Sequence, residues 1–303
     1  MVGSTRREID RIVLRTLKEA GVCEPPVSLD AILGHLKVDR GFYDLADPAL
    51  LRRFWHKVKV QGQRLFRIAH RIKLAGVWLP DESHILIDKA LHPAKQEWAS
   101  FHDAGHRLLP WHRPFFLGDT AQTLDPEYQL QLESEASLAA SGLMFCGPVF
   151  TADARDVSME WAGVMTLKRR YKKSCTTTLR RFVERGPEHP MVMMVSTPSW
   201  EDTPEGQDER WRHFVPSPLF AERFGSVLPR NILGEVDSHA AQRRGGPVAD
   251  FVMHLRADHG TLHGFHVETF YNQYDNLTLC VALAPGKVTR VIVPGLATSA
   301  VYP

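Results

Sequence analysis

Apolar residues recur at helical spacing in the first part of the chain. They predict a helix over residues 6–20 that ends at Gly21. The inward face of this helix is formed by Ile9, Ile12, Val13 and Leu17. After Pro25-Pro26 interrupt the chain, Ser28 is suited to cap the N-terminus of a short second helix.

Short apolar runs, which are typical of strands, occur in two later parts of the chain. Residues 76–79 and 84–88 flank the polar turn 80–83, and this arrangement predicts a β-hairpin. Beyond residue 250 strand-like runs return, separated by turns rich in Gly, Pro and Asn. These runs are residues 251–255, 261–270, 277–283 and 288–293.

Helical periodicity dominates between these two regions. Pro93 suits the first turn of a helix that Pro110 would stop. A second long helix is expected over residues 128–143. Two shorter helices with a break between them are expected at residues 158–172 and 176–185.

The length of the chain and this change in pattern predict two domains in an α+β protein. The 303 residues exceed most single domains, and 44% hydrophobic and 24% charged residues are typical of a soluble globular protein. We expect a first domain over residues 1–190, including a helical extension at 158–186. A linker at 191–210 and a β-rich domain at 211–303 would follow.

The sequence does not predict secretion or membrane insertion. The first residues lack the apolar stretch of a signal peptide, and no run of about 18 apolar residues occurs. Cys23, Cys146, Cys175 and Cys280 are far apart and form no Cys-x-x-Cys pair, which argues against a zinc ribbon or a redox motif. We therefore expect a cytoplasmic protein with free thiols.

The strongest chemical signal is a histidine pair on the helix predicted after Pro93. His102 and His106 are four residues apart, which is about 400° of helical rotation, so their rings project from one face. Two neutral imidazoles in this arrangement can bind one Zn²⁺ ion. The opposite face of the helix is apolar, which fits a site supported by the protein core.

A carboxylate directly follows the first histidine. In the motif HExxH a Glu at this position is the general base that activates a water molecule at zinc. Here the residue is Asp103, whose side chain is one methylene shorter, a loss of reach of about 1.5 Å. Because a misplacement of about 1 Å can lower a rate about 100-fold, the motif supports metal binding better than it supports catalysis.

A third metal ligand is expected from the following long helix, which contains Glu133 and Glu135. Glu135 aligns with Leu132, Ala139 and Leu143 on the apolar, inward face of that helix. A carboxylate there is costly unless it is paired or bound to a metal. Glu133 lies on a more mixed face, so we favour Glu135 as the ligand and keep Glu133 as the alternative.

Several segments around the motif share their order and spacing with a known family. Residues 98–109, WASFHDAGHRLL, resemble F-T-x-A-HE-x-GH-x-L-L, and residues 135–144, EASLAASGLM, resemble E-A-N-x-F-A-A-x-L-L. Residues 26–32, PVSLDAI, are similar to P-V-d-l-x-x-I. All three patterns belong to the ImmA/IrrE-type zinc metallopeptidases, which this chain resembles over about residues 8–185.

The resemblance implies a zincin-like metallopeptidase domain with a helical extension. His102, His106 and Glu135 would bind Zn²⁺, and Asp103 would be the catalytic carboxylate. Known members cleave helix-turn-helix repressors and so switch on stress or mobile-element genes, which makes such a repressor the implied partner. In longer members a sensor-like domain follows the peptidase, which suggests a sensory role for residues 211–303.

Departures from the family pattern leave the activity open. Asp103 replaces the usual Glu, and Ser137 and Ala139 replace the usual Asn and Phe. A non-catalytic metal-binding regulator, which binds its partner without cleaving it, is therefore an alternative to the peptidase.

A basic segment provides a third hypothesis. Between Val164 and Gly186 eight Lys or Arg residues and one Glu give a net charge of +7, and the rest of the chain carries −5 of the total +2. Two helices with this charge can bind nucleic acid phosphates. We expect a solvated face instead, because recognition helices also need specific polar residues. Direct nucleic acid binding is the less favoured alternative.

The remaining histidines carry weaker signals. His112 follows the motif helix, where it would either line the cleft and stabilise an oxyanion or lie in a surface loop. His259, His263 and His266 suggest a second metal site. The odd spacing of the last two, however, puts them on opposite faces of a strand, so we expect no metal site there.

Overall fold

The structure, a computed structural model, describes residues 3–22, 24–43, 76–79, 84–113, 126–202 and 209–284. It combines helices and strands, in agreement with the expected α+β class. The chain divides into a first compact unit, residues 1–152 and 169–174, and a second one, residues 153–168 and 175–303. In the described part of the chain, no helix has the length and apolar character needed to cross a membrane.

A three-stranded sheet lies in the first unit, in the order β1-β3-β2. β2 (Gly76–Leu79) is antiparallel to β3 (His84–Asp88), which confirms the predicted hairpin, although its turn lies outside the described residues. β1 (Asp39–Tyr43), which no sequence pattern indicated, runs parallel to β3.

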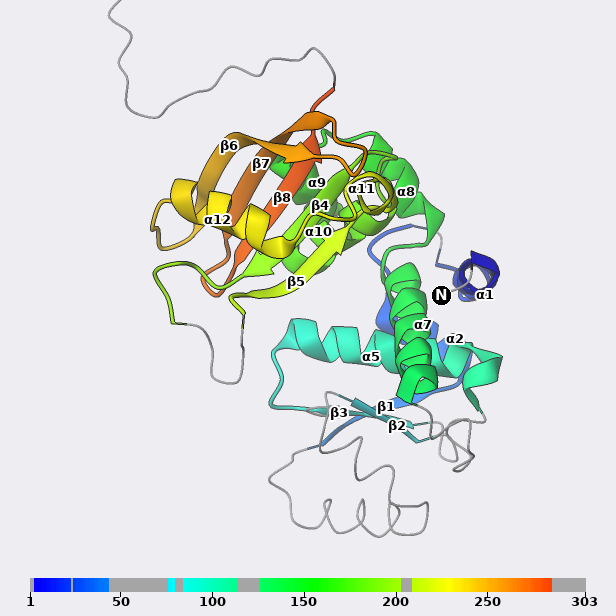
Figure 1. Ribbon diagram of the computed structural model, residues 1–303. Coiled ribbons are helices and arrows are strands. Elements are labelled where there is room, and N and C mark those ends of the chain that lie inside the picture. The colour runs from blue at the N-terminus through cyan, green and yellow to red at the C-terminus, as the bar shows by residue number, and fades with distance from the viewer. Residues whose placement is uncertain are drawn as a thin grey trace, which may run out of the picture. The chain divides into compact units, whose positions relative to one another are not determined.

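The helices of the first unit stack on this sheet. α5 contacts β2 and β3 on one side and α7 on the other, and α7 in turn contacts α1 (Figure 1). α5 and β3 are in contact, and Phe101 of α5 and Ile85 and Ile87 of β3 are fully buried. The helices are α1 (Gly3–Glu19), α2 (Leu29–Leu36), α5 (Pro93–Leu108), the 3-10 helix η2 (Pro110–His112) and α7 (Pro126–Met144). Helix α8 (Pro148–Arg155) spans the boundary between the two units.

Two helix starts follow from local sequence. The Ser28 side chain accepts a hydrogen bond from the backbone N–H of Ala31, so Ser28 is the N-cap of α2 as predicted. Pro93 occupies the first turn of α5, where its missing N–H is harmless. The cap of α5 is the His92 side chain, which accepts from the N–H of Ala94. The motif helix therefore begins where the sequence predicted.

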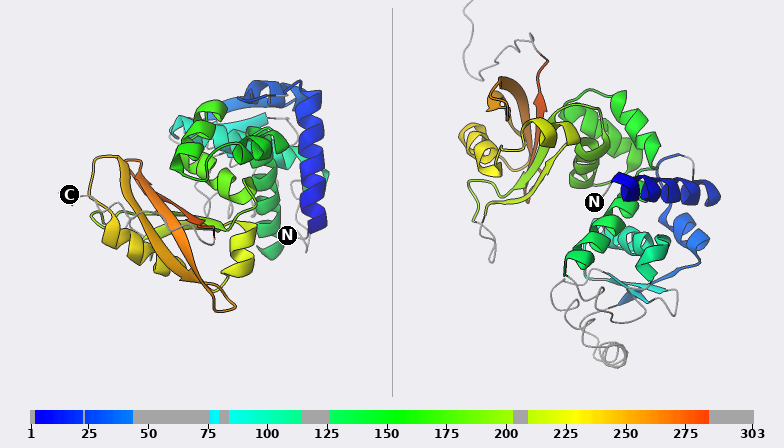
Figure 2. Two further views of the ribbon diagram at one scale, coloured as in Figure 1. Left: turned by 90° about the horizontal axis from the view of Figure 1, so that it is seen from above. Right: turned by 45° about the vertical axis from the view of Figure 1, so that its right-hand side comes forward.

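A five-stranded antiparallel sheet forms the second unit, in the order β5-β4-β8-β7-β6. Helix α12 lies along one face of this sheet (Figure 2). α9 (Trp161–Tyr171) spans the boundary between the two units. The other elements are α10 (Cys175–Arg185), β4 (Met191–Ser196), β5 (Trp211–Pro216), α11 (Pro218–Arg223), α12 (Pro229–His239), β6 (Gly246–Arg256), β7 (Leu262–Tyr271) and β8 (Asn276–Ala282). The strand predicted at 288–293 lies outside the described residues.

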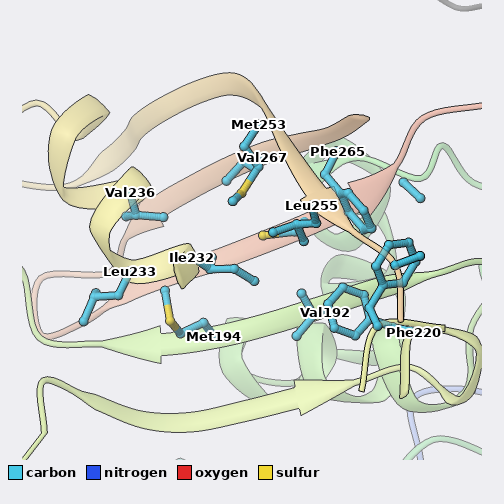
Figure 3. Packing of buried hydrophobic residues seen from close by; sticks show 14 residues of the cluster. Val192, Met194, Phe220, Ile232, Leu233, Val236, Met253, Leu255, Phe265 and Val267 are labelled. Atoms are coloured by element: carbon cyan, nitrogen blue, oxygen red, sulfur yellow. The ribbon is translucent and has the colours of Figure 1, made fainter. Parts of the chain in front are cut away.

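The core of the second unit lies between the sheet and helices α11 and α12. Val192 and Met194 of β4 contribute to it, as do Phe220 of α11 and Ile232 of α12 (Figure 3). Since neighbouring side chains of a strand alternate between faces, the other residues of β4 face the opposite side of the sheet. There α10 contacts β4 and β5, which explains why all six residues of β4 are buried.

The second unit differs from the predicted β-rich domain in its limits. Residues 191–196, predicted as the start of a linker, form the strand β4. A strand buried on both faces is apolar throughout and lacks the polar alternation that marks a half-buried strand, so its pattern was not distinctive. The predicted helical extension is divided: α10 belongs to the second unit, and α9 contributes residues to both.

Phe265→Ala is expected to destabilise the second unit. The ring of Phe265 is fully buried and packs edge-on against Phe220 and Phe224. Its removal leaves a cavity and should cost about 3–5 kcal/mol of unfolding free energy, measured by denaturant titration with tryptophan fluorescence. Leu262→Ala, at an exposed position of the same strand, should change it by less than about 0.5 kcal/mol. Equal losses of unfolding free energy in the two variants would contradict the assignment of Phe265 to the core.

Candidate metal centre

Helices α5 and α7 approach each other closely at Gly105. A Cβ atom on Gly105 would lie 2.6 Å from the carbonyl oxygen of Ala136, so a larger residue would require one helix to shift. His102 and His106 flank this glycine on α5. The contact therefore sets the distance between the two imidazole rings and the side chains of α7.

Three side chains converge beside this crossing, namely His102, His106 and Glu133. Each offers one ligand atom, and the three atoms lie within 4.8 Å of one another. Nε2 of His102 is 3.0 Å from Oε2 of Glu133, and Nε2 of His106 is 3.5 Å from Oε1. Across the described ranges, this is the one group of three His, Cys, Asp or Glu residues that meets this criterion.

The other nitrogen of each imidazole contacts a different protein group. Nδ1 of His102 lies 3.4 Å from Oγ of Ser137, and Nδ1 of His106 lies 2.9 Å from Nδ1 of His112. Both rings are therefore held at Nδ1 and direct Nε2 toward Glu133. Metal-binding histidines are commonly oriented through their second nitrogen in this way.

Glu135 is buried, as predicted, but its carboxylate lies among other partners. Nε1 of Trp111 donates to it at 2.6 Å and the amide of Gln131 at 2.7 Å, and Nε2 of His112 is 3.1 Å away. The structure thus brings the alternative ligand, Glu133, to the histidine pair and places Glu135 beside His112. Residues separated by two positions on a helix differ by about 200° in direction, so the carboxylates of Glu133 and Glu135 leave α7 on nearly opposite sides.

The charge of Glu133 dominates the electrostatics of the centre. Burial alone would raise the pKa of Glu133, but the neighbouring imidazoles of His102 and His106 hold it well below its ordinary value. Burial also opposes the charged form of His102, yet Glu133 and Asp103 outweigh it and raise that pKa. At His106 burial prevails, and the pKa is lowered. The centre therefore presents an anionic carboxylate to two imidazoles.

Asp103 is buried next to the centre without belonging to the three-residue cluster. Its Oδ2 atom has no hydrogen-bond partner in the described part of the chain. Burial raises the pKa of Asp103 to about 7, although the charge of His102 acts in the opposite direction. A buried carboxylate oxygen without a hydrogen-bond partner is costly to maintain, and ionisable groups with a strongly shifted pKa are concentrated at functional sites.

The structure places the other histidines considered in the sequence in different environments. His112 is fully buried and therefore lies neither in a cleft nor in a surface loop. Its partner Glu135 is 23 residues away in the chain, so no local sequence pattern indicated this position. His263 packs against Phe224, whereas His266 contacts Asp250 at 2.7 Å. These two therefore lie on opposite faces of β7, as the spacing predicted.

Part of the basic segment is paired or buried within the chain. Nζ of Lys173 is buried and lies 2.5 Å from Oε1 of Glu97. Arg180 forms an ion pair with Glu184 at 2.8 Å, and Arg181 is buried. The predicted pair of helices is confirmed as α9 and α10, but these side chains do not form a uniformly solvated basic face.

Comparisons with known proteins reveal a similarity at the level of the fold. No protein-family model matches the chain, and no curated protein sequence matches it significantly. A solved structure described as a Mycobacterium tuberculosis transcriptional regulator is similar, with a TM-score of 0.52 and 12% sequence identity. The match covers 91% of this chain and 87% of the other. It therefore shows a common fold over most of both chains.

Gly105→Ala is expected to disturb the centre through the helix crossing. The added methyl group would force α5 away from Ala136 and displace the histidine pair relative to Glu133. We expect a loss of about 1–3 kcal/mol in unfolding free energy, measured by urea titration. Zn²⁺ binding should weaken at least about tenfold, measured by competition with a chromophoric chelator.

Gly34→Ala is the matched control for this substitution. Gly34 is also helical, but no atom lies within 4 Å of the position that its Cβ would take. Replacement should therefore leave Zn²⁺ binding unchanged and be neutral or stabilising by up to about 1 kcal/mol. Similar effects of the two substitutions would show that the close approach at Gly105 does not set the site.

Proposed function

We propose that the chain is a zinc-dependent endopeptidase of the ImmA/IrrE type with a zincin-like first domain. The observation that carries the proposal is the convergence of His102, His106 and Glu133 beside Asp103, the carboxylate that directly follows the first histidine. Two histidines one helical turn apart, a following carboxylate and a Glu from a later helix are the parts of a hydrolytic zinc site.

The donor set fits zinc. Two imidazoles and one carboxylate are the protein ligands of catalytic zinc sites that keep a position open for water. The side chain of Glu133 is 41% exposed and that of His102 is 19% exposed, so the centre is open to water on this side. A bound zinc ion would polarise a water molecule and the scissile carbonyl group.

Asp103 is the proposed general base. It lies next to His102 in the chain, is buried, and has one carboxylate oxygen without a hydrogen-bond partner in the described part of the chain. That oxygen is able to accept a proton from the attacking water and return it to the leaving amine. The shorter side chain of Asp relative to Glu is expected to make this transfer slower.

The proposed substrate is a helix-turn-helix repressor. This assignment rests on the resemblance of residues 98–109 and 135–144 to the ImmA/IrrE family, whose known members cleave such repressors. The solved structure of similar fold is itself described as a transcriptional regulator. Cleavage of a repressor would then switch on the genes that it controls.

A metal-binding regulator without turnover is the second candidate. The observation that favours it is the shorter side chain of Asp103 at the position where the motif usually has Glu. Such a protein would use the same centre to hold its first unit in the shape that its partner recognises. Direct binding of nucleic acid by the basic segment is less favoured, because the buried pair of Lys173 with Glu97 and the burial of Arg181 reduce the charge available to phosphates.

The wild-type protein is expected to bind about one Zn²⁺ ion per chain. His102→Ala and Glu133→Ala each remove a ligand and should weaken binding by at least about 100-fold, more than the loss of an outer contact usually costs. Elemental analysis and chelator competition measure both quantities. His254→Ala, at an exposed position of β6, should bind like wild type. Unchanged binding in both ligand variants would exclude this site.

Asp103→Ala should retain zinc and lose peptide cleavage. Removal of a general base lowers turnover by about 100-fold or more, which mass spectrometry of a proteome-derived peptide library would detect. His102→Ala gives the background of the assay. Undiminished cleavage by Asp103→Ala would remove Asp103 as the base. Absence of cleavage by the zinc-loaded wild type would favour the regulator without turnover.

A further inference from the structure

We propose that Glu135 and His112 form a hydrogen-bond relay that fixes the tautomer of His106, so that Nε2 of His106 presents its lone pair to the metal. The inference rests on the proposed metal centre and makes Glu135 and His112 positioning residues. All three side chains are buried, with residue exposures of 1%, 0% and 4% for Glu135, His112 and His106. They connect α7, η2 and α5.

The direction of the relay is set at Glu135, because a carboxylate only accepts hydrogen bonds. Trp111 and Gln131 donate to it at 2.6 and 2.7 Å. The two donors bind different oxygens, so both oxygens of the carboxylate accept an N–H, an arrangement that favours the ionised form. The 3.1 Å contact with Nε2 of His112 then requires a proton on that nitrogen.

The tautomer of His112 then determines that of His106. A neutral His112 with its proton on Nε2 has a lone pair on Nδ1. This atom is 2.9 Å from Nδ1 of His106, and two lone pairs facing each other at that distance repel, so His106 supplies the N–H.

As a consequence, Nε2 of His106 is unprotonated and able to bind a metal ion. With its proton on Nδ1, the neutral ring directs the Nε2 lone pair toward Glu133, whose Oε1 atom is 3.5 Å away. Two acceptors that face each other are stabilised by a cation between them. The charge of Glu135, transmitted through His112, also makes the imidazole a stronger donor to the metal.

His102 provides an internal contrast. Its Nδ1 atom is 3.4 Å from Oγ of Ser137, a hydroxyl that is able either to donate or to accept. This contact orients the ring without dictating which nitrogen carries the proton. Substitutions in the relay should therefore change the tautomer of His106 and leave that of His102 as it is.

The test combines nitrogen NMR with Zn²⁺ affinity in the full chain. Long-range ¹H–¹⁵N spectra of the metal-free protein at about pH 8, above the ordinary pKa of histidine, should show Nε2 of His106 unprotonated. His112→Phe keeps a ring but removes the Nδ1 acceptor. It should give mixed tautomers at His106 and weaken Zn²⁺ binding by about 10- to 100-fold.

Two further variants separate the relay from general packing. Glu135→Gln keeps the side-chain shape but is able to turn an N–H toward His112, and it should shift His106 in the same direction as His112→Phe. Trp111→Phe removes another donor to the same carboxylate oxygen while leaving the contact with His112. It should retain the wild-type tautomer of His106 and a Zn²⁺ affinity close to that of wild type.

The outcomes distinguish the relay from the proposed function. A proton on Nε2 of His106 in the metal-free wild type would overturn the relay, as would wild-type Zn²⁺ affinity and tautomer in both His112→Phe and Glu135→Gln. Either result leaves the metal centre in place. If the wild type binds no Zn²⁺, the proposed function fails, and the tautomer of His106 in the metal-free protein still decides the relay.

Discussion

The first unit depends on how closely α5 and α7 approach each other at Gly105. The missing side chain lets the backbone of α5 lie against the carbonyl group of Ala136, and this contact brings residues of two helices within hydrogen-bond distance. Since α5 also packs on β2 and β3, the sheet supports the histidine pair from behind while α7 approaches from the other side. The layered arrangement of sheet, α5 and α7 therefore places the histidine pair next to the carboxylates of α7.

Helix α7 contributes two carboxylates with different tasks. Glu133 leaves the helix toward the solvent-facing side of the histidine pair, and Glu135 leaves it toward the interior, where it meets His112. His106 is thereby held between them, with Nε2 directed at one carboxylate and Nδ1 connected through His112 to the other. Because both carboxylates belong to one rigid helix, a single element sets the ligand geometry and, in our proposal, the proton positions.

Sequence patterns predicted those features that depend on neighbours within one or two turns. The cap at Ser28, the start of α5 at Pro93 and the histidine pair belong to this class. The burial of Glu135 was also predictable from its apolar face, but periodicity shows only that a side chain points inward and does not show which buried group it meets. The partner of Glu135 is His112, which comes from a different helix. Sequence patterns within α7 could not indicate this contact, and Glu135 was therefore interpreted as a metal ligand. Strand β4 was missed because burial on both faces removes the alternation that identifies a strand.

The position of the cluster on two packed helices has a thermodynamic consequence. A ligand that binds only the folded form stabilises it by a free energy that grows with ligand concentration, about 2.7 kcal/mol at 100 times the dissociation constant. A cation held by α5 and α7 would add this free energy to the first unit. The core of the second unit is built from residues of its own sheet and of α11 and α12, and it would gain nothing directly. The fraction of time for which the first unit is unfolded and open to degradation would then depend on the supply of metal in the cell.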